Sequence, residues 1–207
     1  MGYGTTANPV EPGGYFNQTI ADEVYNNGGS VFGYWWLDGP VGYASTTSEA
    51  YSWGQQQAQA AAHAFWNVRA SYYVGMRETV FADIESSSSW GSDHTLNQKV
   101  WEGFYNEMNS LGIGNSGPYP GLFTNTNWYS IMGSDFGVAS GTLLWWSDWV
   151  CDNTDLSPCN PTPPNCPTFM TPPTTPNIPG SSLYMWQYYS NCGNGCTPDY
   201  DCAASLD

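Results

Sequence analysis

Positive charge is nearly missing from this chain, which has 3 Lys and Arg residues against 18 Asp and Glu and a formal net charge of −15. Nucleic acids and anionic membrane surfaces are usually bound through basic patches, so neither is expected as a partner. The simplest interpretation of the negative charge is that it favours solubility. A neutral or cationic polymer remains compatible with such an acidic surface.

Long apolar runs are also missing. No stretch approaches the roughly 20 residues that cross a bilayer as a helix. Residues 1–4 lack the basic and apolar regions of a secretory signal peptide, so neither a membrane segment nor a leader is expected here. Charged residues make up only 10% of the chain whereas aromatic residues reach 16%, with 11 Trp, which is unlike a disordered protein.

Cysteine is missing from the first 150 residues, and six cysteines follow. Only two of them have the spacing of a zinc site, and the two histidines are far away in sequence, so disulfides are favoured over a metal. Disulfides indicate an extracellular protein. Neither a metal nor another cofactor is expected. The sequence does not decide which cysteines pair with one another. The cysteines are Cys151, Cys159, Cys166, Cys192, Cys196 and Cys202.

The length of 207 residues predicts one domain, with a loop insertion rich in cysteine and proline at 150–180. Apolar strand patterns alternate with helical patterns, which is typical of an α/β protein with a mostly parallel sheet. Only six or seven strands can be found, so the prediction is a short, modified TIM-like (β/α) barrel. Strands are predicted at 30–37, 79–85, 118–124, 142–149 and 182–189, and helices at 16–27, 46–66, 92–111 and 127–133.

The strand at 79–85 ends in two carboxylates, Asp83 and Glu85. Residues two apart on a strand share a face, so both should project at the carboxyl end, where barrels keep their catalytic groups. Glycoside hydrolysis commonly uses two carboxyl groups, and a neighbouring Asp can raise the pKa of a Glu until it serves as an acid. The alternative is a cap or an ion pair, but three bases offer few ion-pair partners.

Aromatic side chains gather at the other predicted strand ends, around Tyr34, Phe123, Trp146 and Trp186. Sugar rings stack their apolar faces on such side chains. The alternative is that part of each cluster is core, because alternate residues of a strand face the helices. We expect some of these aromatic side chains to bind sugar rings and others to pack in the core.

Several motifs follow one another in an order that resembles the family 25 glycoside hydrolases, which are lysozymes of the muramidase type. Related glycoside hydrolase-like barrels of bacteria are similar too. The resemblance covers roughly residues 30–207. Its motifs are residues 81–85, 121–125 with Trp128 and 131–133, 144–149, 185–188 and 198–201.

This resemblance implies cleavage of the β-1,4 bond after N-acetylmuramic acid in peptidoglycan. Glu85 would be the general acid, Asp83 would orient the acetamido group or stabilise positive charge, and Asp199 would complete the acidic set. Tyr34 and Trp146 would line the sugar groove. The implied substrate-binding residues are Tyr34, Trp36, Phe123, Trp146, Trp149, Trp186 and Gln187.

The chain departs from the family at its first strand, whose D-x-S motif is not found in residues 1–30. Asp22 lies in a helical pattern, and Asp38 follows a different strand. Two functions are therefore kept. The first is a secreted glycosidase acting on peptidoglycan or a related aminosugar polymer. The second is a catalytically inactive barrel that binds carbohydrate or self-associates as a surface protein.

Overall fold

The computed structural model describes residues 31–69, 76–85, 87–114, 116–119, 124–147, 178–190 and 201–205, together with the single positions Asp22 and Asn26. Most of the insertion at 150–180 and five of the six cysteines lie outside these residues, so the expected disulfides do too. The elements are β1 (Val31–Trp36), α2 (Thr47–Arg69), β2 (Met76–Asp83), α3 (His94–Ser110), β3 (Pro118–Tyr119), α4 (Thr124–Met132), β4 (Thr142–Ser147), β5 (Ser181–Ser190) and β6 (Asp201–Ser205).

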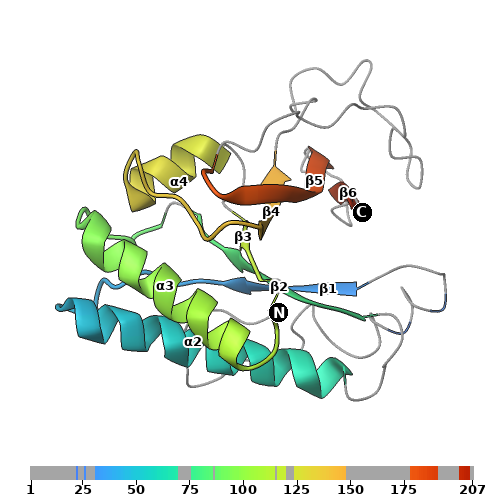
Figure 1. The fold of residues 1–207 in the computed structure, drawn as a ribbon, viewed down its shortest axis with the longest axis horizontal. Helices are drawn as coiled ribbons and strands as arrows, with labels where there is room; N and C mark the ends of the chain where they lie inside the picture. Colours follow the sequence, from blue (N-terminus) through green and yellow to red (C-terminus); the bar gives the residue numbers. More distant parts are fainter. Residues whose placement is uncertain are drawn as a thin grey trace, which may run out of the picture.

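The described strands form two three-stranded sheets (Figure 1). Strands β1, β2 and β3 are parallel, and β4 is parallel to β5, so the predicted α/β class with mostly parallel pairing is confirmed. Strand β6 is antiparallel to β5 and was not predicted. Within the described residues the sheets do not close into a barrel.

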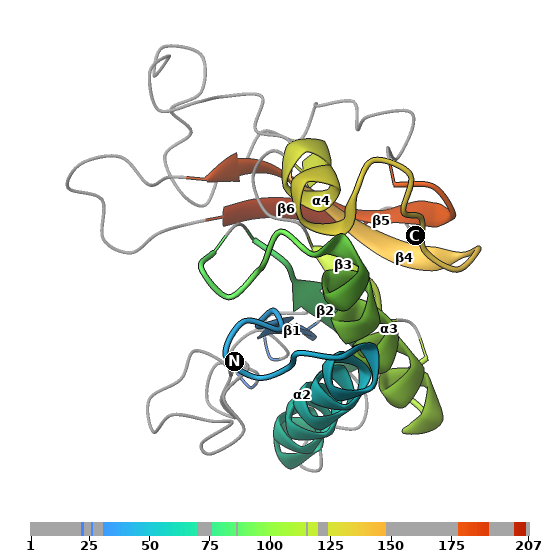
Figure 2. The same ribbon diagram turned by 90° about the vertical axis from the view of Figure 1, so that its left-hand side faces the viewer.

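Strand β3 joins the two sheets in space. The amide of Ala82 on β2 donates to the carbonyl of Gly117, just before β3, at 2.8 Å. A methyl group added at Gly117 would lie 1.5 Å from the carbonyl oxygen of Leu143 on β4, so the two backbones touch there. The second sheet therefore begins beside β3, as Figures 1 and 2 show.

The first sheet presents two different faces. Helices α2 and α3 lie on one side of β1 and β2 (Figure 2), and Trp35, Val80 and Ala82 are buried in the core that the helices share with the sheet. Alternate residues point the other way. On that side Tyr34 and Phe81 contact Trp145 of β4 edge to face, at 6.0 and 5.6 Å between ring centroids.

The spacing of Thr46 and Glu49 in the sequence predicts a capping box at the start of α2, and the structure confirms it. The Glu49 amide donates to Thr46 Oγ1 at 3.2 Å, and Glu49 Oε2 accepts from the Thr46 amide at 3.0 Å. Asp93 caps α3 by accepting from the amide groups of Thr95 and Leu96. Each cap satisfies amide groups that would otherwise lack partners at a helix start.

The segment at 118–124 differs from its prediction. Strand β3 covers only Pro118–Tyr119, and α4 already begins at Thr124 rather than at 127. Proline has no amide to donate, so Pro118 and Pro120 weaken a strand pattern that hydrophobicity alone suggests. In the part of the chain that the structure describes, no helix is both long and apolar enough to cross a bilayer.

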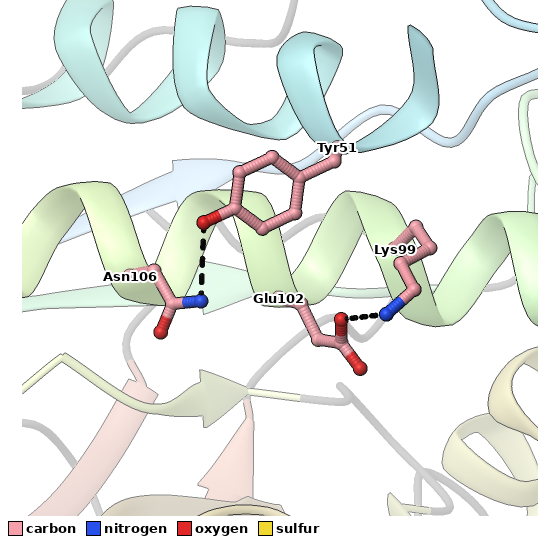
Figure 3. Close-up of polar contacts among 4 residues, drawn as sticks. All are labelled: Tyr51, Lys99, Glu102 and Asn106. Atoms are coloured by element: carbon pink, nitrogen blue, oxygen red, sulfur yellow. Dashed lines mark hydrogen bonds and ion pairs between the residues drawn. The ribbon is translucent and has the colours of Figure 1, made fainter. Parts of the chain in front are cut away.

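Helices α2 and α3 cross in backbone contact. A methyl group at Gly54 would lie 2.0 Å from the Val100 carbonyl oxygen, and one at Gly103 would lie 2.1 Å from that of Tyr51. Glycine weakens a helix interior, so its presence at both positions is explained by this approach. Figure 3 shows a hydrogen bond beside the crossing, from Asn106 Nδ2 to the Tyr51 hydroxyl at 3.2 Å, and the Lys99–Glu102 ion pair on α3.

Gly54→Ala is expected to lower the free energy of unfolding, because the new methyl group would meet the α3 backbone. In an open helix the same change stabilises by about 0.5–1 kcal/mol, whereas overpacking costs about 1–3 kcal/mol. Urea unfolding measures the difference, and Gly103→Ala should behave alike. Gly114→Ala is the control, since its methyl group would meet only Asn109 Oδ1, at 3.6 Å. If neither helix variant changed the free energy of unfolding, the close backbone contact between α2 and α3 would be contradicted.

Candidate active site

The carboxyl ends of β1 and β2 meet at one edge of the first sheet. Trp36 pairs with Asp83 in the parallel register, and the next amide, of Leu37, donates to the Asp83 carbonyl at 2.9 Å. Residues in register share a face, so Trp36 and Asp83 lie on the aromatic side of the sheet. Asp38 and Glu85 follow directly after these strand ends, which gathers three carboxyl groups at this edge.

Asp83 is the most buried of these acids. Its residue surface is only 4% exposed, and Oδ1 has no hydrogen-bond partner. Burial raises the pKa of Asp83 well above its ordinary value, and the nearby charge of Glu85 raises it further. The absence of a donor at Oδ1 agrees with that direction, because nothing there stabilises the ionised form.

Glu85 lies two residues beyond Asp83, past the end of β2, and is only partly buried. Burial raises its pKa above the ordinary value of 4.5. The sequence hypothesis assigned this rise to the charge of Asp83. In the structure burial is the cause that raises the pKa of Glu85, and the charge interaction between the two carboxyl groups contributes to the raised pKa of Asp83.

Asp38 is the third acid, and the sequence analysis set it aside because it follows a strand other than the first strand of the family. The same argument that singled out Asp83 could have found it, since it follows an apolar strand directly. Burial raises the pKa of Asp38, and hydrogen bonding from the Ser89 and Trp36 side chains partly opposes the rise.

The backbone of Asp38 is held by α2. Gln57, whose side chain is fully buried, accepts from the Asp38 amide at 2.8 Å and donates to its carbonyl at 2.9 Å. The Trp53 indole also donates to the Asp38 carbonyl, at 3.1 Å. Two side chains of one helix therefore set the position at which the β1 strand ends.

The loop after β2 forms hydrogen bonds with the residues that follow Asp38. Ser89 accepts from the Gly39 amide through Oγ at 3.0 Å, and its carbonyl accepts from the Val41 amide at 3.0 Å. A methyl group at Gly39 would lie 2.3 Å from the Ser89 carbonyl oxygen, so only glycine allows this approach. The two loops that carry Asp38 and Glu85 are thereby joined.

Aromatic rings surround this edge. Phe81, two residues before Asp83 on the same face, is fully buried between Trp145 and Tyr184. Tyr43, in the loop after Asp38, stacks on the Trp53 ring with centroids 4.0 Å apart and remains 48% exposed. Tyr43 thus places an aromatic ring at the surface near the acids.

The sequence-predicted site residues are only partly brought together. Asp83, Glu85, Tyr34 and Trp36 lie on or just beyond β1 and β2, although the Trp36 indole is engaged with Asp38. In the parallel register of β4 and β5, Trp146 pairs with Trp186 and Ser147 pairs with Gln187, and the side chains of these four residues lie outside the described part of the structure. Phe123, Trp149 and Asp199 also lie outside the described residues.

No group of three His, Cys, Asp or Glu side chains with the arrangement of a metal site occurs among the described residues. Comparison of the chain with family models, with curated proteins and with solved structures finds no match.

Gln57→Met is expected to destabilise the protein by about 1–3 kcal/mol, because it leaves the buried Asp38 amide without its acceptor. Urea unfolding measures this loss. Gln56→Met is the control on the same helix, since Gln56 is exposed and only reaches Ser52 Oγ at 3.4 Å. If the two variants changed the free energy of unfolding equally, the hydrogen bonds from Gln57 to the Asp38 backbone would not stabilise the end of β1.

Asp83→Asn is expected to change how stability depends on pH. A raised folded-state pKa means that the Asp83 contribution is full below the unfolded value near 3.8 and is lost as pH rises through the folded value. The Asn variant cannot ionise, so relative to wild type it should gain stability between acid and neutral pH. Urea midpoints across this range measure the gain.

Glu49→Gln is the control for Asp83→Asn and should show the opposite trend. Hydrogen bonds from Ser45 and Thr46 lower the Glu49 pKa, so its contribution is present at neutral pH and is lost as pH falls. A parallel pH dependence of Asp83→Asn and wild type would show that the Asp83 pKa is not raised.

Proposed function

We propose that this chain is a secreted glycosidase that hydrolyses β-1,4 bonds of peptidoglycan or a related aminosugar polymer, with Glu85 as general acid. One observation carries the proposal. Two carboxyl groups lie together at the carboxyl end of a parallel strand, and burial raises the pKa of both. Raised pKa values are typical of catalytic acids, which must hold a proton near the working pH.

The different burial of the two acids supports different roles. Glu85 is partly exposed, so it can reach the oxygen of a glycosidic bond and donate its proton there. Asp83 is nearly closed off from solvent. Asp83 is therefore assigned a supporting role, in which it orients the substrate acetamido group or stabilises positive charge; Asp199 is proposed to complete the acidic set.

The aromatic face supports a carbohydrate as substrate. Tyr34 lies on the same side of β1 as Trp36, and Tyr43 adds an exposed ring near Asp38. The apolar faces of sugar rings pack on such side chains. Phe123, Trp146, Trp149, Trp186 and Gln187 are proposed to extend this lining.

A short, modified TIM-like barrel is the proposed complete architecture. It is supported by parallel pairing in both sheets, by the contact of β3 with β4, and by rings that meet across the sheets. Phe32 of β1 and Tyr184 of β5 lie 5.9 Å apart between centroids, as inward-facing residues of a barrel would. The six cysteines support disulfides and an extracellular location.

A second candidate function is a catalytically inactive barrel that binds carbohydrate or self-associates. The observation that favours it is the near-complete burial of Asp83, which limits direct contact with a substrate. Purified protein imaged by electron microscopy would then show assemblies, and these would persist in Glu85→Gln.

Glu85→Gln is expected to reduce the release of reducing ends from cell walls or chitin oligomers by about 10²–10⁴-fold, because an amide cannot donate the proton. Binding should be retained. Wild-type kcat should fall as pH rises through the raised Glu85 pKa, since the acid must be protonated. Glu102→Gln, which only breaks the α3 surface ion pair, is the control. If the wild-type protein hydrolysed neither polymer, the enzyme proposal would be contradicted.

A further inference from the structure

A small apolar patch is exposed on the turn that follows β1. Among the described residues, the large hydrophobic side chains that solvent reaches are Val41, Tyr43 and Trp66. Val41 and Tyr43 belong to one turn, which begins three residues after Asp38. Trp66 lies near the other end of α2, roughly 30 Å along the helix from its start. Val41 and Tyr43 are therefore called the turn patch, and Trp66 is not part of it.

The Tyr43 ring has one covered face. Its plane is only 11° from that of the Trp53 indole, with ring centroids 4.0 Å apart, so the two rings are stacked. Trp53 is buried and belongs to the core. Because Tyr43 remains 48% exposed, its solvent-accessible surface lies mainly on the opposite ring face and the ring edge. A flat apolar surface is thus presented to solvent on a buried support.

The turn that carries this ring is held in place by its backbone. The Val41 amide donates to the Ser89 carbonyl, and the Tyr43 amide donates to the Pro40 carbonyl, each at 3.0 Å. Gly42, between them, has a φ of 85°, which favours glycine. The ring is therefore positioned before a ligand arrives, and this lowers the conformational entropy that binding costs.

The turn patch lies on the same loops as the acids. The Trp53 indole, beneath Tyr43, donates to the Asp38 and Gly39 carbonyls, each at 3.1 Å. Ser89, which accepts from the turn, follows Glu85 in the loop after β2. Five residues of extended chain span at most about 18 Å, so Tyr43 lies within that distance of Asp38 between Cα atoms. A ligand of several units can contact both.

The size of the turn patch argues against a protein partner. Val41 and Tyr43 are each about half exposed, and a large side chain buries roughly 150–250 Å², so the patch offers on the order of 200 Å². A stable protein–protein interface covers about 800 Å² on each partner. One flat ring on a rigid support instead fits one ring of a ligand.

The charge of the protein favours a neutral ligand over an anionic one, because the formal net charge is −15. A neutral sugar unit meets both requirements: its ring is of similar size to the Tyr43 ring, and its C–H groups form an apolar face. Its hydroxyl groups stay in water at the edge of the stack, as the exposure of Tyr43 allows.

We propose that Tyr43, supported by Trp53, forms a sugar-stacking subsite that holds a unit of the polysaccharide away from the bond that is cleaved. This inference rests on the proposed function and adds a preference for long chains. A sugar bound at the acids reaches Tyr43 only when the chain continues far enough. Tyr43 should therefore contribute to the binding of long oligomers and contribute little to that of short ones.

Chitohexaose and chitobiose test the subsite, because they differ only in length. Calorimetry with Glu85→Gln protein measures binding without hydrolysis, and chitohexaose should bind more tightly. Adding Tyr43→Leu should weaken chitohexaose binding about 10-fold and change chitobiose binding little, since leucine covers Trp53 but lacks the flat ring. Tyr43→Phe keeps the ring and should retain binding. Trp66→Leu is the control, because it makes a matching change at an exposed ring on α2 and should affect neither sugar.

Several results would overturn the inference: no binding of chitohexaose, equal weakening of both sugars in Tyr43→Leu, no weakening of either, or an equal loss in Trp66→Leu. Binding of poly-L-proline in place of the sugars would assign the ring to a peptide and would overturn it too. If Tyr43→Leu does not fold, Tyr43→Trp decides. Its larger flat face should increase the preference for chitohexaose, and an unchanged or smaller preference would reject the subsite.

Hydrolysis of chitohexaose by protein with native Glu85 separates this inference from the proposed function. Turnover by the wild-type protein, with an unaffected length preference in Tyr43→Leu, would retain the glycosidase and reject the subsite. Length-dependent binding that requires the Tyr43 ring, without any turnover, would retain the subsite and reject the glycosidase.

Discussion

The parallel pairing of β1 with β2 is the constraint on which the candidate site depends. Because Trp36 lies opposite Asp83, both strands end at the same edge, and the acids that follow them are brought together. A shift of one residue in either strand would turn its acid toward the helices. The register is therefore protected on both faces, by the helix core on one side and by the aromatic contacts of Tyr34 and Phe81 on the other.

The site is built at a cost to stability. Burying Asp83 without a donor at Oδ1 is unfavourable whenever the group is ionised. The surrounding structure offsets this strain with well-satisfied groups: Gln57 completes the Asp38 backbone, and Ser89 links the two loops. Rigid support around unfavourable acids is what a preorganised site requires.

Much of the local structure could be predicted from the sequence. The capping box at Thr46, the helix predicted at 92–111 and the strand that ends near Asp83 depend on short-range periodicity and hydrogen bonding, and they are confirmed. Strand β6 and the early start of α4 were missed. A strand such as β6 is stabilised by its pairing with β5 rather than by its own pattern, so its residues alone carry little signal.

The sequence by itself determined which residue types are available: many acids, few cations, abundant aromatics, and the Asp83/Glu85 pair two positions apart. Only the tertiary structure decided their chemistry. Asp38 and Asp83 are the same residue type after similar strands, yet one receives two donors and the other has an unpartnered buried oxygen. The donors come from Trp36 and Ser89, and Ser89 is far from Asp38 in sequence, in the loop after β2. Desolvation and hydrogen bonding depend on such distant neighbours, which no local pattern records.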